Sequence, residues 1–479
     1  MSMKQKDLAK AYLANQIGRR EFLARTASLG VSAGAAGVLL NAVATEALAA
    51  GSVDFQKHKG KAIKLLLNKH PYVDAMIKNI ENFKAMTGLA VTYDIFPEDV
   101  YFDKVTAALA AKSTQYDAFM TGAYQTWKYG PARQIVDLNQ FIKDPKLTAD
   151  EYDWNGIFPS LRESTAWDGK AGSKLGGPGA KQWAVPWGFE LNSVTYNRKV
   201  FDDLKITPPE NLPDLIEKAK KINGSGKGMY GVGVRGSRSW ATIHPGFLSA
   251  YANYGEKDFD VQEGKLKPAM NSAGSKAFHK MWVDMIKQAG PKNWSNYTWY
   301  EVGTDLGAGK SGMIFDADIL GYFMNGAGNK EAGNLGFQAF APNPKAQNAT
   351  PNVWIWSLAM SEFSKNKEAA WFFIQWATGT PNTTFGATQA DLVNPVRKVV
   401  WDNPDFQARL EKSYPGYLKQ FQASIMNSRI YFTPQQLFPD FTTEWAAMLQ
   451  QMHAGQVPVD EGLDKLAEGL ERKLRAVGL

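Results

Sequence analysis

The sequence contains no cysteine, and this absence restricts the chemistry that the chain can perform. Without a thiol there is no disulfide framework, no thiolate metal site, no cysteine nucleophile and no lipid-modified cysteine of the bacterial lipoprotein type. Histidine is scarce as well, and the five histidines stand at positions 58, 70, 244, 279 and 453 without the paired spacing of a zinc site. We therefore expect neither a metal nor any other cofactor.

Long apolar runs and dense basic stripes are also missing. No stretch after the N-terminal region reaches the ~20 apolar residues of a membrane span. The net charge is +7, but the basic residues are dispersed, which disfavours a nucleic-acid partner. The 479 residues, 44% of them hydrophobic, are enough for two packed lobes of about 200 residues each.

The N-terminus has the features of an export signal. Gly18 to Leu23 (GRREFL) has the form of a twin-arginine motif, and a weakly apolar, Gly/Ala-rich stretch continues to Leu40. Ala47 to Ala49 supplies a small-x-small cleavage pattern. We therefore expect residues 1–49 to be a signal peptide that uses the twin-arginine export machinery, is cleaved near Ala49 and leaves a periplasmic protein. The alternative is an ordinary amphipathic N-terminal helix.

Strands and helices alternate in the region after residue 60. A buried strand is predicted at 62–67 (AIKLLL) and further strands at 89–96 and 116–120, with helical spacing at 72–86 and 100–111. This order predicts a parallel α/β sheet with right-handed crossovers, in which ligands bind beyond the carboxyl ends of the strands. Polar or aromatic candidates stand in the three loops that follow these strands, namely Lys69, His70, Glu98, Gln125 and Trp127. Solvent exposure is the alternative for Lys69 and His70, and a cap of the next helix is the alternative for Glu98.

One stretch, Gln182 to Lys199 (QWAVPWGFELNSVTYNRK), is a strand with a polar middle. Trp187, Glu190 and Asn192 interrupt a run that would be continuously apolar in a buried parallel strand. Such a strand lies at an edge, or it crosses a cleft and shows these side chains to a ligand; we favour the cleft. Hinge hydrogen bonds are the alternative role for Glu190 and Asn192, and core packing is the alternative for Trp187.

Further strands and helices are expected in the second half of the chain. A glycine-rich surface loop, either a hairpin tip or a flexible insertion, is predicted at 168–181. Strands are predicted at 229–234, 311–315 and 352–359, and helices at 214–222, 275–289, 367–378 and 460–474.

These elements add candidate ligand residues. Asp316 and Asp318 end a buried strand, where they would share a face if the strand continues, or would cap the next helix. Trp354 and Trp356 stand two residues apart and so share one face of a strand, where they either line a cleft or pack in the core. Two further candidates complete the set: Arg397, a bidentate donor just past Asn394-Pro395, and Trp240, which would act with Arg235.

Five segments together resemble a known family. They are Val91–Asp117 (with YDAFM), Ala184–Lys199 (VPW…YNRK), Gly309–Asp318 (GKSGMIFDAD), Asn352–Thr380 (with SKNKEAAWFFIQW) and the C-terminal VDEGLDKLAEGLERKL. In order and content they resemble the extracellular solute-binding proteins of family 1, the sugar-binding proteins of ABC importers of the maltose-binding-protein type. The resemblance extends from about residue 61 to the end of the chain.

This resemblance implies a two-lobed periplasmic-binding-protein fold of type II, α/β in class, with a ligand cleft between lobes that about three crossing strands join. Lobe one would comprise residues 51–186 plus 350–400, and lobe two 187–349 plus 401–479. The crossings are expected near 186–190, 349–352 and 397–401.

The resemblance also implies a function. A monomer would capture a sugar, sugar alcohol or short oligosaccharide by lobe closure, without catalysis, and deliver it to separate ABC permease subunits in the inner membrane. It places an acidic sugar ligand at Glu190 and a ligand-donating loop at Lys69 and His70, whereas two aspartates stand where many relatives have an aromatic residue. Two alternatives stay open: an exported carbohydrate hydrolase with Asp316 and Glu190 as its carboxylate pair, and a binder of a non-sugar solute such as a polyamine or a phosphate ester.

Overall fold

The computed structural model describes residues 2–479 except 14–16, 18, 32–38, 40–42 and 44–52. The chain divides into two compact units. Unit 1 comprises Met1–Trp167, Gly176–Phe189 and Ile355–Arg409, and unit 2 comprises Asp168–Leu175, Glu190–Trp354 and Leu410–Leu479. The predicted cleavage site at Ala47 to Ala49 lies outside the described residues, which include two helices before it, α1 (Met3–Leu13) and α2 (Arg19–Ala27).

Unit 1 is built on the parallel strands predicted from the sequence. Strands β1 (Ala62–Asn68), β2 (Ala90–Phe96) and β3 (Ala118–Gly122) pair in parallel in the order β2-β1-β3. Part of β12 (Val353–Met360) continues the sheet antiparallel to β3. Leu65, Leu66 and Leu67 are at most 1% exposed, and burial of each contributes about 1.5–3 kcal/mol.

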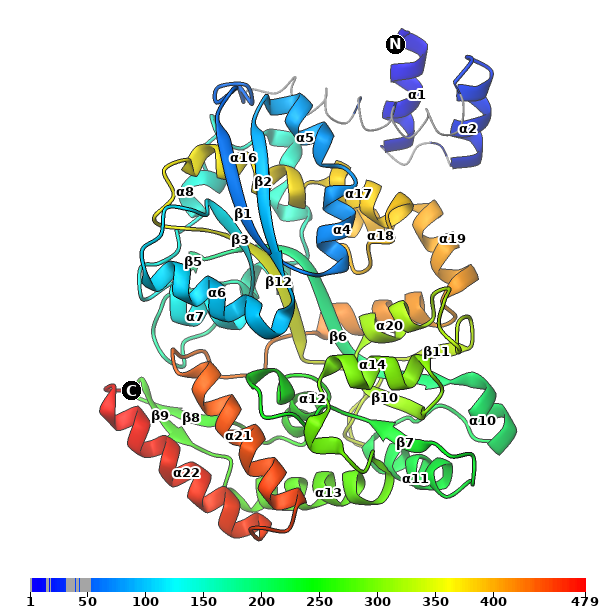
Figure 1. The fold of residues 1–479 in the computed structure, drawn as a ribbon, viewed down its shortest axis with the longest axis vertical. Coiled ribbons are helices and arrows are strands. Elements are labelled where there is room, and N and C mark those ends of the chain that lie inside the picture. The colour runs from blue at the N-terminus through cyan, green and yellow to red at the C-terminus, as the bar shows by residue number, and fades with distance from the viewer. Residues whose placement is uncertain (1, 14–16, 18, 32–38, 40–42, 44–52) are drawn as a thin grey trace. The chain divides into compact units, whose positions relative to one another are not determined.

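Helices flank this sheet (Figure 1). In unit 1 they are α4 (Pro71–Ile77), α5 (Ile80–Thr87), α6 (Glu98–Ala110), α7 (Ala123–Tyr129), α8 (Asn139–Ile142), α9 (Pro159–Ser164), α16 (Lys367–Thr378), α17 (Thr380–Gln389), α18 (Lys398–Trp401) and most of α19 (Pro404–Ser413). Short 3-10 turns lie at Asp150–Tyr152 and Trp154–Gly156.

The single helix predicted over residues 72–86 was wrong, because the structure has two helices, α4 and α5, in this region. The break falls at Lys78 and Asn79. Asn79 is buried and its Nδ2 donates to Asn382 Oδ1 at 2.9 Å. Asparagine side chains compete with the helical hydrogen-bond ladder and favour helix ends, so this side chain anchors a tertiary contact at the start of the second helix.

Unit 2 contains a mixed sheet. Strands β7 (Tyr230–Gly233) and β10 (Ser311–Ala317) are parallel, and β6 (Val185–Asn197) runs antiparallel to β10 with Asn192 opposite Ala317. Strand β11 (Leu335–Gln338) pairs antiparallel with residues 194–197 of β6, which overlap the stretch that pairs with β10. Strand β8 (Phe259–Gln262) forms a hairpin with β9 (Lys265–Pro268).

Helices surround the strands of unit 2 (Figure 1). They are α10 (Arg198–Leu204), α11 (Leu212–Asn223), α12 (Phe247–Asn253), α13 (Ala273–Ala289), α14 (Trp299–Gly307), α15 (Asp318–Met324), α20 (Tyr417–Ser424), α21 (Phe438–His453) and α22 (Val459–Ala476). Short 3-10 turns lie at Trp240–Thr242, Trp294–Asn296 and Ile425–Asn427.

Two strands contain residues of both units. The boundary between the units falls between Phe189 and Glu190 in β6, and between Trp354 and Ile355 in β12. The chain also passes between units after Arg409, within α19. A fourth excursion is the loop Asp168–Leu175, which belongs to unit 2 although the hairpin strands on either side of it, β4 (Ala166–Trp167) and β5 (Lys181–Gln182), belong to unit 1. The predicted hairpin tip at 168–181 is confirmed by this β4–β5 pairing.

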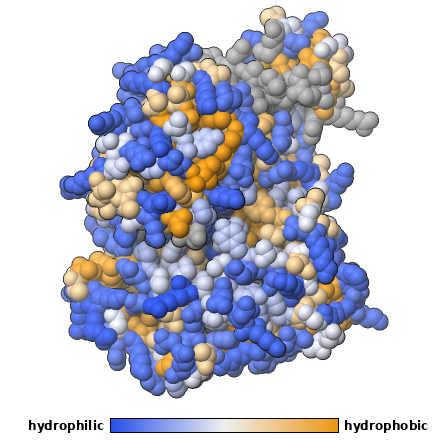
Figure 2. Space-filling model, in the orientation of Figure 1, coloured by the Kyte–Doolittle hydropathy of each residue, from blue (hydrophilic) through white to orange (hydrophobic). Residues whose placement is uncertain are grey.

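The surface is that of a charged protein. The face in Figure 2 is mainly hydrophilic, as expected for a chain with 21% charged residues. Within the described part of the chain, no helix is both long enough and apolar enough to cross a membrane.

Candidate functional site

The carboxyl ends of the parallel strands of unit 1 carry two buried amide side chains. Asn68, the last residue of β1, is 0% exposed, and neither its Oδ1 nor its Nδ2 has a hydrogen-bond partner among the described residues. Gln125 follows the neighbouring strand β3, is 5% exposed, and its Oε1 lacks a partner in the same part of the chain. Leaving such a group unpaired costs about 1–3 kcal/mol, so these positions are suited to a polar ligand.

Asn68 was not among the residues predicted from the sequence, whereas Gln125 was. The signal was present in the sequence, because an asparagine ends the otherwise apolar strand AIKLLLN. Lys69, which was predicted, has an exposed side chain in the next position.

An aromatic group lies beside these amides in unit 1. His70 caps α4 through its Nδ1, which accepts from the Tyr72 backbone N–H at 3.3 Å. The His70 ring stacks on Tyr72 at 4.7 Å between centroids and contacts the Trp356 ring at 5.1 Å. Burial lowers the pKa of His70 to about 3, so the ring is neutral at physiological pH. Trp356 also stacks on Phe102, at 6.0 Å and 12°.

Gly188 allows Tyr72 to pack against β6. A Cβ at Gly188 would overlap the Tyr72 ring, and the Tyr72 hydroxyl donates to the Phe189 carbonyl at 3.1 Å. Trp187 is 2% exposed and its ring lies 6.3 Å from that of Tyr72. This segment therefore fixes the ring that stacks on His70.

Glu98, Trp127 and Arg397, which were also predicted as ligand residues of unit 1, contact mainly other parts of the protein. Glu98 begins helix α6 and is half-buried. Trp127 is 0% exposed and contacts the ring of Tyr124 at 5.3 Å, which fits core packing.

Arg397 is also 0% exposed. Its guanidinium donates to the carbonyls of Thr378 at 2.6 Å and Asp153 at 2.9 Å and lies 4.9 Å from the Tyr152 ring centroid. These contacts favour a role for Arg397 in holding unit 1 together.

Unit 2 contains a buried ion pair at the carboxyl ends of β7 and β10. Arg235 follows β7, and Asp316 lies near the end of β10. Arg235 Nε donates to Asp316 Oδ2 at 3.0 Å and Nη2 donates to Oδ1 at 2.8 Å, so the pair is bidentate. The side chains are 6% and 0% exposed. Bidentate, charge-assisted pairs of this kind are strong and geometrically specific.

Three rings adjoin this pair. The His244 ring stacks on Trp354 at 5.1 Å and on Trp240 at 5.9 Å, and the rings of Trp240 and Trp354 are 5.2 Å apart. Burial and the positive charge of Arg235 hold the pKa of His244 well below its ordinary value, so this ring is also neutral. Unit 2 therefore combines a charge-balanced donor–acceptor pair with aromatic surfaces.

The predicted polar residues of β6 lie in unit 2. Asn192 is 2% exposed and its Oδ1 accepts from Ser249 Oγ at 2.7 Å. Glu190 is 7% exposed and shares a face of β6 with Asn192, because side chains alternate along a strand.

Asp316 and Asp318 do not share a strand face, because the strand does not continue past Ala317. Asp318 stands instead in the first turn of the next helix, as the alternative placed it, but the N-cap residue is Ala317. Strand β10 ends at Ala317, and Asp318 is the first residue of α15. Asp318 Oδ1 accepts from the Leu191 backbone N–H at 3.1 Å, which ties the start of this helix to β6.

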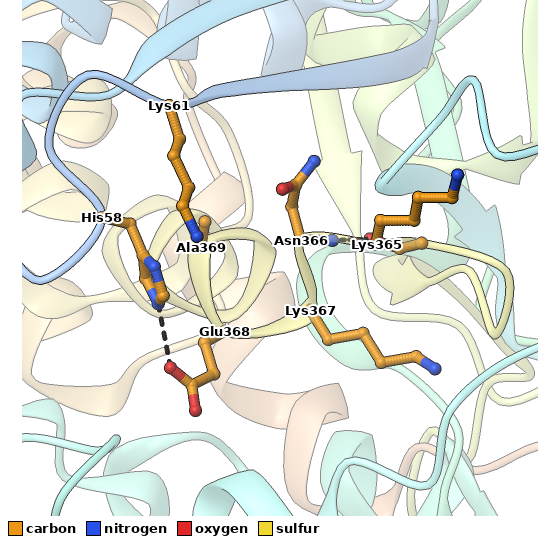
Figure 3. A pocket seen from close by; sticks show the side chains of 8 residues that line it. His58, Lys61, Lys365, Asn366, Lys367, Glu368 and Ala369 are labelled. Atoms are coloured by element: carbon orange, nitrogen blue, oxygen red, sulfur yellow. Dashed lines mark hydrogen bonds and ion pairs between the residues drawn. The ribbon is translucent and has the colours of Figure 1, made fainter.

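A cavity of about 270 Å³ lies elsewhere in unit 1, beside the start of α16 (Figure 3). It is lined by His58, Lys61 and residues 364–369 and contains none of the predicted ligand residues. Glu368 in its wall pairs with His58 at 2.9 Å and Lys57 at 2.7 Å, and these partners lower the pKa of Glu368. No cluster of metal-ligating side chains is found in the described residues.

The sequence matches the family model described as bacterial extracellular solute-binding protein over residues 69–384. The chain belongs to this family, which confirms the resemblance seen in the sequence and its two-lobed type II fold class. It is 38% identical over 453 residues to the erythritol/L-threitol-binding protein of Mycolicibacterium smegmatis, covering 92% of this chain and 94% of that protein. A mannitol-binding protein of Pseudomonas aeruginosa is 24% identical over 306 residues, which cover 63% of this chain and 64% of that protein.

A solved structure gives the same fold. The ABC transporter solute-binding protein of Agrobacterium vitis with bound D-mannitol superposes with a TM-score of 0.73 at 25% identity, covering 88% of this chain and 99% of the other. The chain is therefore a bacterial extracellular solute-binding protein, and the relatives named here bind sugar alcohols.

Proposed function

We propose that the protein is the exported binding subunit of an ABC importer and that its ligand is a short, uncharged sugar alcohol of the tetritol class. The choice of a tetritol is supported by the relative that binds erythritol and L-threitol, which matches almost the full chain. The relatives that bind mannitol are more distant in sequence.

The observation that carries the proposal is the Arg235–Asp316 pair beside the rings of Trp240, His244 and Trp354. Each hydroxyl of a polyol both donates and accepts a hydrogen bond, so a fixed donor next to a fixed acceptor suits a vicinal diol. The C–H edges of the carbon chain suit an aromatic surface. The neutral histidines and the balanced ion pair favour an uncharged ligand over a polyamine or a phosphate ester.

Unit 1 carries a second set of groups that suit a polyol. We assign ligand contacts there to the amides of Asn68 and Gln125 and to the rings of His70 and Trp356, in addition to Glu190, Asn192 and the ion pair of unit 2. Lys69, Glu98, Trp127, Trp187, Asp318 and Arg397 then act in support of these groups.

Capture would occur by closure of the two units on the ligand, with flexing where β6 and β12 pass from one unit to the other. The closed form would dock on the permease subunits of the importer. A radius of gyration, measured by small-angle scattering, that decreases at saturating ligand would support this mechanism, and an unchanged radius would contradict it.

Export would use the twin-arginine route, with residues 1–49 as the signal and a monomeric protein in the periplasm. This part of the proposal rests on the Arg19–Arg20 pair and the Ala47 to Ala49 pattern. Replacement of both arginines by lysine should leave the unprocessed chain in the cytoplasm; processing and export at the normal level would contradict it. The molar mass of the exported protein, measured by light scattering, would test whether it is a monomer.

A thermal-shift panel tests the ligand. Erythritol, L-threitol, ribitol, D-mannitol and maltose would each be added to the purified protein. A ligand at 100 times its Kd stabilises a protein by about 2.7 kcal/mol, so we expect a rise in Tm of several degrees with the tetritols and less with maltose. No shift with any polyol would refute the proposed ligand class.

We expect no catalysis. The hydrolase alternative needs Asp316 as a free acid or nucleophile, whereas the bidentate pair with Arg235 fixes this carboxylate and leaves Oδ2 one lone pair, enough to accept from a ligand hydroxyl. Ligand recovered unchanged after prolonged incubation, as seen by NMR, would support binding alone. Release of a product from an oligosaccharide would favour the enzyme.

A further inference from the structure

The carboxamide of Asn192 has one end fixed and the other end unpaired. Its Oδ1 accepts from Ser249 Oγ at 2.7 Å. Its Nδ2 is buried without a hydrogen-bond partner among the residues that the structure describes, and the whole residue is 2% exposed. A buried amide donor without a partner costs about 1–3 kcal/mol, so the position is explained if the ligand supplies the acceptor.

The serine hydroxyl that holds this amide is itself held. Ser249 lies on α12, is 1% exposed, and its Oγ accepts from the backbone N–H of Asn352 at 2.7 Å. Because the Ser249 oxygen accepts the Asn352 N–H with a lone pair, its single hydroxyl proton remains available and is donated to Asn192 Oδ1. The result is a relay in which Asn352 orients Ser249 and Ser249 orients Asn192.

The same chain of hydrogen bonds is connected to the loop that carries His244, one of the three rings beside the ion pair of unit 2. Asn352 Nδ2 donates to the His244 carbonyl at 2.8 Å, and Asn352 Oδ1 accepts from the Tyr431 backbone N–H at 3.1 Å. The Asn192 backbone N–H donates to the Asn352 carbonyl at 3.3 Å. Asn192 is therefore fixed through both backbone and side chain to the residue that also fixes the loop of His244.

We propose that Ser249 is a positioning residue that turns the Asn192 carboxamide so that its Nδ2 donates to a hydroxyl oxygen of the bound polyol. This inference rests on the proposed function and adds to it a residue that does not itself touch the ligand. With Oδ1 bound by Ser249, the amide presents its N–H donors to the ligand. It complements the Asp316 carboxylate, whose Oδ2 keeps a lone pair beside the hydrogen bond from Arg235.

The test is a double-mutant cycle on the full chain, with the Kd for erythritol measured by isothermal titration calorimetry. Asn192→Ala and Ser249→Ala should each weaken binding about tenfold, the effect expected for one lost hydrogen bond. The double variant should bind no more weakly than Asn192→Ala alone, because Ser249 acts on the ligand only through Asn192. A merely structural role for Ser249 would produce the same loss in both backgrounds.

Ser275→Ala is the matched control. Ser275 is a buried serine on α13 of unit 2 whose Oγ donates to the Met270 carbonyl, and its side-chain hydrogen bonds within the described chain involve Tyr251, Met270 and His279 rather than Asn192. This variant should lower Tm while leaving the Kd within twofold of the parent protein.

Two failures can be told apart. A parent protein that binds erythritol while Ser249→Ala keeps its Kd, or loses affinity equally in both backgrounds, overturns the positioning role alone. A parent protein that binds neither erythritol, L-threitol nor D-mannitol overturns the proposed function, and this inference with it.

Discussion

Replacement of both members of the Arg235–Asp316 pair should weaken ligand binding while leaving the unfolding free energy largely unchanged. The pair is almost completely buried and bidentate. The perturbation consists of two single changes, Arg235→Met and Asp316→Leu, and the double change R235M/D316L. Each single change leaves one uncompensated charge inside unit 2, whereas the double change leaves none.

The magnitudes follow from the burial of the two side chains. Removal of one partner of a buried pair costs about 3–5 kcal/mol, but replacement of both partners by apolar side chains of similar size is often neutral or stabilising. We therefore expect both single variants to lose several kcal/mol of unfolding free energy and the double variant to recover most of it. Affinity should not recover, because hydrogen bonds to charged groups contribute about 1.5–3 kcal/mol each, and two of them correspond to a factor of roughly 100 or more in Kd.

The assay pairs urea denaturation of the ligand-free protein with calorimetric titration of erythritol. The exposed pair Lys199–Asp203 of the same unit is the control, and its replacement by Met and Leu should change neither quantity measurably. A double variant that is as unstable as the singles would show that uncompensated charge is not the cause of the loss. A double variant with the parent Kd would show that the pair does not contact the ligand.

Three further predictions concern other parts of the site and of the fold. Asn68→Leu removes a buried amide that has no partner in the described chain, so the ligand-free protein should keep or gain unfolding free energy while its Kd for erythritol rises about tenfold or more; a destabilised variant with unchanged Kd would contradict this. Burial lowers the pKa of His279 to about 4, below its ordinary 6.5, so the stability that the neutral ring provides is complete above about pH 6.5 and is lost as the pH falls toward 4, by about 3 kcal/mol. Urea denaturation of the parent and of His279→Gln between pH 7 and 4 should show that the variant loses less unfolding free energy as the pH falls. Burial raises the pKa of Asp258 to about 6, but this contribution is the same in both proteins and cancels in the comparison. Equal slopes of unfolding free energy against pH would refute the prediction. Gly188→Ala would place a methyl group against the Tyr72 ring and should cost about 1–3 kcal/mol together with affinity, whereas an unchanged Tm would show that the ring moves away freely.

Much of the architecture follows from local sequence. The apolar runs predicted at 62–67 and 311–315 are buried strands in the structure, because leucine-rich and apolar runs bounded by polar turns bury best as strands of a covered sheet. The strand predicted at 89–96 forms as well, but at the edge of the sheet with most of its residues exposed or half-buried. The twelve-residue aromatic helix Lys367–Thr378 was predicted to the residue. The family, too, was recognisable from segments such as YNRK and GKSGMIFDAD.

The tertiary structure alone decided what the polar side chains do. Asp316 is paired with Arg235, 81 positions away in the sequence, and Asn192 is held by Ser249, 57 positions away. No local pattern reveals such partners, because hydrogen bonds between distant residues depend on where the strands end and on which side chain is left beside them. Arg397 illustrates the same point: in the sequence it has the chemistry of a ligand donor, but in the fold its guanidinium is bound by the carbonyls of Asp153 and Thr378.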